Sequence, residues 1–168
     1  MTDLSSFPMS RVILVGELNP YGADPYFALY HLPREASGNR LREILGLGDV
    51  DYLKLGRVNL CTGSYSPNVA AAQARLLLSG PYDFYVLLGA KVRAAFGGPA
   101  FFSHERREDG RILVGLPHPS GRCRVWSDVT ARPRARALLL KLCPQVPWGE
   151  VDSKLSGKLA LTPDAVVE

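Results

Sequence analysis

Four runs rich in apolar residues predict the strands of a central sheet. They cover residues 11–15, 55–60, 83–88 and 112–114. A strand with one solvent-exposed face alternates polar and apolar residues, but most of these runs contain hardly any polar residue. Such strands are typical of parallel sheets whose two faces are both covered by helices. We therefore expect a mainly parallel, four-stranded central sheet.

Helical patterns follow each of these strands. Apolar positions at helical spacing predict helices at residues 37–45, 67–78, 89–96 and 130–143. Ser37 and Thr130 are expected to cap the first and the last helix, and Pro67 to open the second. Because strand and helix alternate four times, the sequence predicts a three-layer α/β/α fold. A length of 168 residues fits a single domain over residues 1–168.

The remaining segments carry weaker patterns. Residues 24–36 are aromatic-rich and are expected to be irregular. Residues 101–110 are expected to form a charged excursion that ends in an Asp-Gly turn. Residues 1–10 and 145–168 show no clear periodicity and are expected to be flexible or peripheral.

The charge of the chain is unevenly distributed. The formal net charge is only +4, but residues 122–141 hold six basic side chains and one acidic side chain. A basic concentration of this kind favours a polyanionic partner such as nucleic acid. A solvated helix face would give the same pattern and stays open as an alternative. We expect a monomer that binds a nucleic acid and contacts no membrane.

The three cysteines of the chain argue against a metal centre. Cys61, Cys123 and Cys143 are far apart, and no C-x-x-C spacing occurs. Zinc and iron–sulfur sites need closely spaced ligands, so no metal and no other cofactor is expected. An odd number of cysteines without a secretory segment points to the reducing cytoplasm.

A turn rich in proline and glycine follows the last predicted strand, and it contains the most reactive candidate side chain. Pro117 and Pro119 fix the backbone on either side of His118, and Gly121 adds freedom where the chain must bend. A histidine held in this way, with arginines close behind it, suits an anionic ligand or a developing negative charge. A histidine that merely bonds the backbone of a turn is an equally valid interpretation of this stretch alone.

Polar residues at three predicted strand ends are expected to converge. Asn19 follows the first strand, Asn59 ends the second, and His118 follows the fourth. In open α/β sheets, ligands bind outside the carboxyl ends of the strands. The loop that begins at Gly16 is not a phosphate-binding loop, because neither G-x-x-x-x-G-K-[ST] nor G-x-G-x-x-G occurs. An amide such as that of Asn19 can orient water but cannot act as a general base near neutral pH.

These residues carry a resemblance to a known family. Gly16-Glu-Leu-Asn-Pro20 resembles G-x-N-P-G, and the segment Ser37-Gly-Asn-Arg-Leu resembles G-N-R-F-W. His118-Pro-Ser-Gly-Arg-Cys-Arg124 resembles both N-P-S-G-L-S-R and H-P-S-P-L. These are motifs of the uracil-DNA glycosylase superfamily, in particular of its mismatch-specific uracil/thymine branch. The resemblance covers roughly residues 11–142 and implies that superfamily's fold.

The resemblance implies excision of uracil, or of a related deaminated or mismatched base, by base flipping. His118 would stabilise charge on the departing base, and Asn19 would hold the attacking water, since an asparagine replaces the aspartate of the most efficient uracil enzymes. Asn59 would read the edge of the base. The first motif has one extra residue, Leu18, and Tyr21 stands where glycine is usual.

The sequence thus gives a set of site residues. The catalytic candidates are Asn19 and His118. The base-binding candidates are Gly16, Glu17, Pro20, Tyr21, Phe27, Tyr30 and Asn59, with Phe27 or Tyr30 stacking on the base. The DNA-binding candidates are Ser120, Gly121, Arg122 and Arg124, and Arg122 stands where related enzymes place a leucine that fills the gap in the duplex.

Two other functions fit the same residues. A non-catalytic nucleic-acid or nucleobase binding module would use the same crevice, because fold alone does not fix function. A hydrolase of small nucleosides or nucleotides is the weaker alternative. Activity on monomers would indicate the hydrolase, and binding to DNA without strand scission would indicate the module.

Overall fold

A five-stranded sheet with the strand order β2-β1-β3-β5-β4 forms the centre of the molecule. The computed structural model describes residues 8–20 and 22–149. The strands are β1 (Val12–Asn19), β2 (Gly56–Thr62), β3 (Phe84–Leu88), β4 (Ser103–Arg106) and β5 (Ile112–Leu116). Neighbouring strands are parallel except for β4, which pairs antiparallel with β5 at the edge of the sheet.

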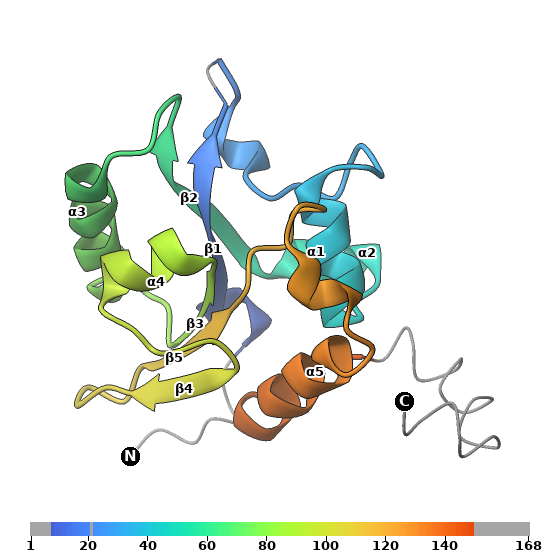
Figure 1. The fold of residues 1–168 in the computed structure, drawn as a ribbon. Coiled ribbons are helices and arrows are strands. Elements are labelled where there is room, and N and C mark those ends of the chain that lie inside the picture. The colour runs from blue at the N-terminus through green and yellow to red at the C-terminus, as the bar shows by residue number, and fades with distance from the viewer. Residues whose placement is uncertain (1–7, 21, 150–168) are drawn as a thin grey trace, which may run out of the picture.

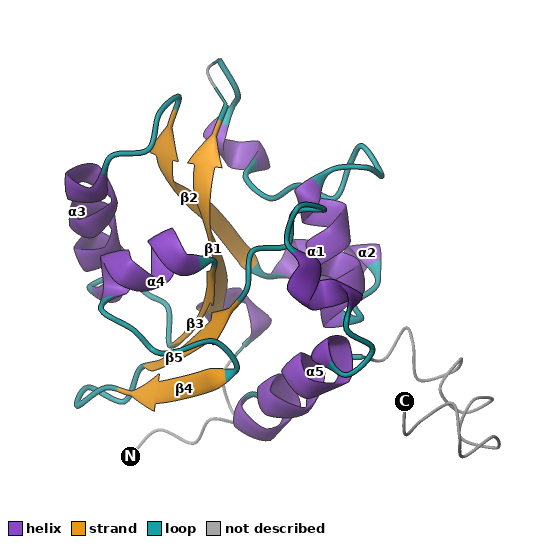
Figure 2. Cartoon of the chain, viewed as in Figure 1, coloured by secondary structure: helices purple, strands orange, loops and turns teal. Residues whose placement is uncertain are grey.

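Helices cover both faces of this sheet, as Figures 1 and 2 show. The helices are α1 (Ser37–Leu45), α2 (Asp49–Lys54), α3 (Pro67–Leu78), α4 (Ala90–Phe96) and α5 (Ala131–Leu142). Short 3₁₀ turns are η2 (Met9–Arg11), η3 (Pro25–Phe27) and η4 (Arg124–Ser127). Helices α3 and α4 lie against one face, and α1, α2 and α5 lie against the other.

The period of two along β3 explains why there are two apolar cores. Phe84, Val86 and Leu88 point to the core under α1, α2 and α5, whereas Tyr85 and Leu87 point to the core under α3 and α4. All five side chains are fully buried. A strand covered on both faces must be apolar at every position, which is why β3 has no alternating pattern in the sequence.

The three-layer α/β arrangement predicted from the sequence is confirmed. The four predicted strands form the parallel part of the sheet, in the order β2-β1-β3-β5. The predicted strand number was one too low, because β4 falls within the stretch expected to be a charged excursion. This strand has only β5 as a neighbour, so its polar residues can face solvent.

The first strand is longer than predicted, and this changes the setting of the first motif. Residues 16–19 were expected to form a loop, but they continue β1 through pairs such as Gly16 with Asn59 and Asn19 with Thr62. Pairing between β1 and β3 ends at Val15 and Leu87. The end of β1 therefore projects past the body of the sheet with β2 as its only neighbouring strand (Figure 1).

Some predicted boundaries were wrong in detail. Ala36 occupies the N-cap of α1, without a side-chain cap, and the hydroxyl of Thr130 donates to Asp128 instead of capping α5. Helix α2 was not predicted. Within the tail expected to be peripheral, Val146 and Trp148 are buried against the core beside α1 and α5.

Candidate functional site: a cleft at the carboxyl ends of the strands

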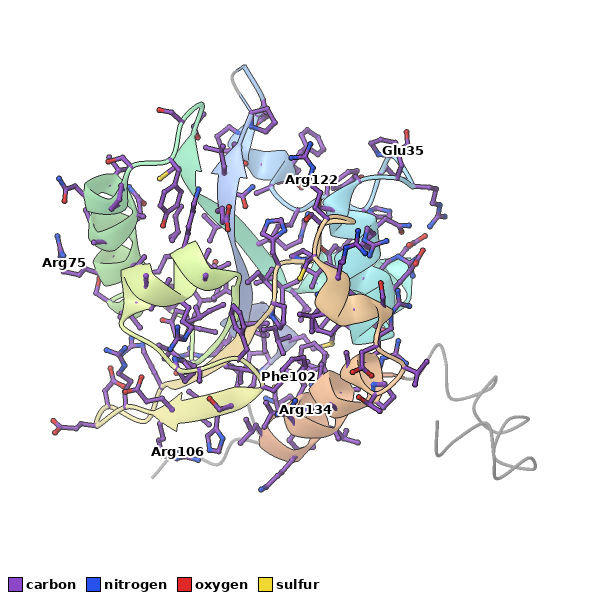
Figure 3. All side chains as sticks on the ribbon, viewed as in Figure 1. Glu35, Arg75, Phe102, Arg106, Arg122 and Arg134 are labelled. Atoms are coloured by element: carbon purple, nitrogen blue, oxygen red, sulfur yellow. The ribbon has the colours of Figure 1, made fainter. Side chains whose placement is uncertain are left out.

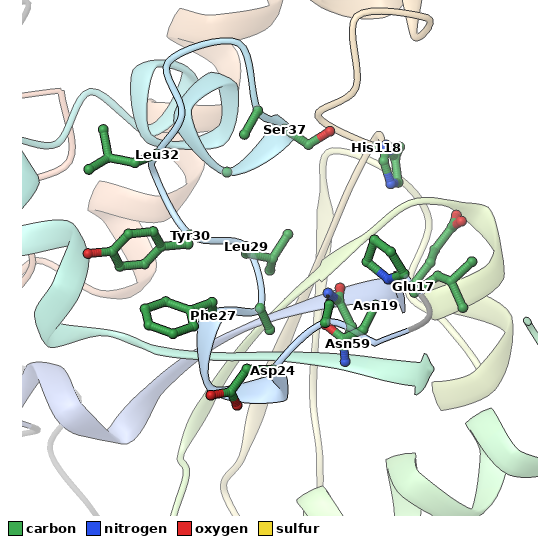
Figure 4. Close-up of a pocket in the computed structure, with 16 residues that line it drawn as sticks. Glu17, Asn19, Asp24, Phe27, Leu29, Tyr30, Leu32, Ser37, Asn59 and His118 are labelled. Carbon is green, nitrogen blue, oxygen red and sulfur yellow. Dashed lines mark hydrogen bonds between the residues drawn. The ribbon is translucent and has the colours of Figure 1, made fainter. Parts of the chain in front are cut away.

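A cleft of about 450 Å³ opens where β1, β2 and β5 end. Strand β1 leads to helices on one face of the sheet, and its neighbour β3 leads to α4 on the other face. Such a reversal is where open α/β sheets place their ligands. The walls come from the end of β1, the segment 23–32, the start of α1, Asn59 and His118 (Figure 4).

Two asparagines form a hydrogen-bonded pair at the base of the cleft. Nδ2 of Asn59 donates to Oδ1 of Asn19 over 2.8 Å, and Nδ2 of Asn19 donates to the hydroxyl of Thr62 over 3.3 Å. Asn19 is only 4% exposed. Each amide keeps further capacity, namely the second lone pair of the Asn19 oxygen and the second N–H of Asn59. The pair can therefore both accept a hydrogen bond from a ligand and donate one to it.

Gly16 makes room for this pair. It lies in β1 opposite Asn59, and a Cβ atom at this position would overlap Oδ1 of Asn59. Gly16 is buried beneath the asparagine and does not line the cleft. The absence of a Cβ atom at Gly16 therefore leaves room for the Asn59 side chain, while the predicted contact of Gly16 with the base stays a prediction.

The hydrogen bonds of His118 define its protonation pattern. The backbone N–H of Ser120 donates to Nδ1 of His118 over 3.0 Å. A ring nitrogen that accepts a hydrogen bond carries no proton, so in the neutral imidazole the proton is on Nε2. His118 is half-buried and lines the cleft. It is therefore arranged as a neutral hydrogen-bond donor.

Two further hydrogen bonds hold the His118 loop in place. The indole N–H of the buried Trp126 donates to the carbonyl of His118 over 3.0 Å. Nε of Arg40, from α1, donates to the carbonyl of Pro119 over 3.0 Å. Pro117 and Pro119 are themselves buried. The loop is thus fixed to α1 and to the core, and sequence reasoning did not identify Arg40 or Trp126 as its supports.

The opposite wall is aromatic. Phe27 is 50% exposed and packs edge-to-face on Tyr30 with ring centroids 5.0 Å apart. The guanidinium of Arg57 lies 5.7 Å from the centre of the Tyr30 ring and donates to the carbonyl of Ala28. Arg57 belongs to β2, so this contact ties the aromatic segment to the sheet. Both aromatics predicted to stack on the base line the cleft.

The backbone between these aromatics is held in an unusual conformation. Leu29 has φ of 54°, in the left-handed region that favours glycine. The hydroxyl of Tyr52 donates to the carbonyl of Leu29 over 2.6 Å and so stabilises this conformation. Burial raises the pKa of Tyr52 well above its usual value, so this hydroxyl keeps its proton at physiological pH. Tyr52 was not predicted as a supporting residue.

The start of α1 closes the cleft from a third side. Ala36, Ser37 and Gly38 line it. A Cβ atom at Gly38 would overlap the carbonyl oxygens of Leu29 and Tyr30, so only glycine lets the helix pack directly on that backbone. The sequence marked this segment only through its family resemblance and did not place it in the site.

The structure brings most of the predicted site residues together, while their roles stay predictions. Those that line the cleft are Glu17, Asn19, Pro20, Phe27, Tyr30, Asn59 and His118. The predicted DNA-binding residues Ser120, Gly121, Arg122 and Arg124 follow His118 in the chain. The N–H of Ser120 is used by His118, so only its hydroxyl remains for a phosphate. Tyr21 lies outside the described residues.

The basic residues after position 121 differ in their contacts. Arg122 and Arg124 are exposed in the segment that follows His118, and no hydrogen bond or ion pair engages either side chain in the part of the chain that the structure describes. Arg136 instead donates to the carbonyls of Glu43 and Ile44 at the end of α1. Arg134 lies over the ring of Phe102, 4.4 Å from its centre. Two of the basic residues predicted to bind a polyanion, Arg134 and Arg136, therefore make contacts within the fold.

Comparisons with known proteins add no relative. No family model matches the chain, and no curated protein matches it.

Across residues 8–20 and 22–149, no cluster of histidine, cysteine or acidic side chains has the arrangement of a metal site. No described helix has the length and apolar character needed to span a bilayer.

Proposed function

We propose that this protein is a DNA glycosylase that binds an extruded base in the cleft and hydrolyses its N-glycosidic bond. The substrate would be uracil or a related deaminated or mismatched base. The observation that carries the proposal is the N–H of Ser120 bonded to Nδ1 of His118, which leaves the Nε2 proton for a ligand. A neutral donor suits a base that leaves with negative charge.

The other walls of the cleft supply what base binding requires. A volume of about 450 Å³ is within the range of small-ligand sites. Phe27 and Tyr30 offer aromatic surface on which a planar base can stack. The Asn59 amide keeps its own carbonyl oxygen as an acceptor and a second N–H as a donor, which suits the alternating imide and carbonyl groups of a uracil edge and leaves the Asn19 oxygen for water.

The chemistry follows from this arrangement. Extruding the nucleotide from the duplex costs a few kcal/mol, and less for a mismatched base. As the C1′–N bond breaks, positive charge develops on the sugar and the bonding electrons move to the base. Nε2–H of His118 donates to the base oxygen on which this charge accumulates, and Oδ1 of Asn19 positions the water that adds to C1′.

An abasic-site assay tests the proposal. Single- and double-stranded oligonucleotides with one uracil, hypoxanthine, xanthine or mismatched thymine are incubated with the protein and then treated with alkali. We expect strand scission at the modified position of at least one substrate. Intact strands across the whole panel would rule out a glycosylase, and release of bases from free nucleosides alone would indicate a monomer hydrolase.

A binding module is the second candidate, and one observation favours it. Asn19 stands where an efficient glycosylase would have a carboxylate, and its amide is already bonded to Asn59 and Thr62. A module would retain tight, salt-dependent binding to the modified strands. It would produce no abasic site, so the same oligonucleotides distinguish the two functions.

Arg122 is expected to act as a wedge that enters the duplex where the base has left. Its exposed guanidinium is flat and can stack on neighbouring bases or bond the orphaned base. We therefore expect Arg122→Ala to slow cleavage of duplex substrate much more than cleavage of single strands, in which no stack must be held open. Single-turnover rates on the two substrates measure this difference.

Arg75→Ala provides the matched control for this experiment. Arg75 is an exposed arginine on α3, at the left edge of Figure 3 and well separated from Arg122. Its replacement removes the same charge and should affect both substrates little. If Arg122 is only a phosphate contact, its loss should slow both substrates alike and reduce the salt dependence of binding by about one unit.

A further inference from the structure

Glu17 is the one residue of the first motif whose chemistry the proposed function leaves unused. It lines the cleft as the second residue of Gly16-Glu-Leu-Asn-Pro20 and is half-buried. Asp24 is the other carboxylate of the lining, but it accepts the N–H of Tyr26 at the start of η3. Within the described residues, no hydrogen bond or ion pair engages the carboxylate of Glu17. It is therefore available to a ligand or a water molecule.

Glu17 and His118 approach the same point from two strands. Gly89, which follows β3, lies between them: a Cβ atom there would be 3.0 Å from Oε1 of Glu17 and 3.4 Å from Cδ2 of His118. Cδ2 is the ring carbon bonded to Nε2, the nitrogen that carries the proton. Figure 4 shows Glu17 and His118 on the same side of the cleft and Phe27 and Tyr30 on the other. A base stacked on the aromatics would place its sugar towards Glu17.

The charged and titratable neighbours of Glu17 come from several elements. His118 follows β5, and Asp24 lies in the loop after β1. Tyr65 precedes α3, and Lys91 of α4 lies over its ring. Burial raises the pKa of Tyr65, with smaller contributions from Cys61 and Glu17, which indicates that the carboxylate is close enough to affect this phenol. No cation pairs with Glu17 among the described residues.

We propose that Glu17 is the general base of the reaction and supplies the carboxylate that Asn19 lacks. The inference rests on the proposed glycosylase function. Asn19 holds the water through Oδ1, and Glu17 accepts one of its protons as the water oxygen bonds to C1′. The C1′–N bond breaks at the same centre, and its electron pair leaves with the base, which His118 stabilises. The carboxylate also offsets the positive charge that develops on the sugar.

Glu17→Gln tests this role. A general base contributes about 10²- to 10⁴-fold, so we expect the single-turnover rate to fall by about 10²-fold or more. Affinity for DNA should stay equal or increase, because the substitution removes a negative charge from a surface that faces phosphates. Glu35→Gln is the matched control, since Glu35 is exposed just before α1 and does not line the cleft.

Chemical rescue separates a base from a structural residue. Formate should restore part of the rate of Glu17→Ala, whereas chloride at the same ionic strength should not. A residue needed only for folding would show no such rescue.

The experiments can reject Glu17 as the general base without rejecting the proposed glycosylase function. If the wild-type protein cleaves a substrate and Glu17→Gln cleaves it at a rate within about threefold, Glu17 is not the base and the proposed glycosylase function stands. Absence of formate rescue together with weakened DNA binding would assign Glu17 to structure. A wild-type protein that cleaves nothing would overturn both proposals.

Discussion

His118→Ala is expected to slow single-turnover excision of the base by about 10²-fold or more, the scale of one lost transition-state hydrogen bond. The reason is that Nε2–H of His118 donates to charge that exists mainly when the bond is breaking. Affinity for the same DNA should fall far less, because phosphate contacts supply most of it. Rates under enzyme excess and binding titrations at one salt concentration measure the two effects.

His104→Ala serves as the control for this experiment. His104 is exposed on the edge strand β4, away from the cleft, so its loss should leave both rate and affinity unchanged. Equal losses of binding and cleavage in His118→Ala would show that this imidazole holds the substrate and does not stabilise its transition state. An unchanged rate would remove His118 from the mechanism.

Gly38→Ala is expected to destabilise the fold by about 3 kcal/mol, since an added methyl group would overlap two carbonyl oxygens of the backbone at Leu29 and Tyr30. Backbone cannot move aside as a flexible side chain can. For a chain of this length the corresponding fall in Tm is roughly 6–12 °C. Thermal unfolding followed by circular dichroism measures it.

The same substitution should also weaken base binding, because α1 and the aromatic segment would be pushed apart at the wall of the cleft. Gly121→Ala is the control for stability: Gly121 is exposed, and a Cβ there would have only Arg40 as a neighbour, at 4.0 Å. If Gly38→Ala has the same Tm as the wild-type protein, α1 does not pack directly on the backbone at Leu29 and Tyr30.

The strands that are buried on both faces could be predicted from the sequence, because such burial requires apolar residues at nearly every position. Strands β1, β3 and β5 are covered on both faces, and their unbroken apolar runs identify them. Strand β4 has alternating half-buried and exposed residues over only four positions, Ser103–Arg106, and three of the four are charged or titratable. So short and polar a segment resembles a loop, and only its pairing with β5 makes it a strand.

The convergence of Asn19, Asn59 and His118 was predictable because parallel strands end at one edge of the sheet. Their partners were not predictable. The hydrogen bond from Ser120 to His118 depends on the exact path of the loop. Arg40, which supports that loop, is far from it in the sequence. Sequence periodicity contains no information on such contacts, which arise only when α1 packs beside the turn.

The extended end of β1 has a consequence for how the cleft distinguishes its ligands. Beyond Val15 this strand pairs with β2 on one side, while no described strand pairs with its other side. Peptide N–H and C=O groups on that side have no strand as a partner among the described residues, as at the edge of a sheet. Every amino acid except proline presents the same two groups, so recognition through this edge would tolerate changes of side chain.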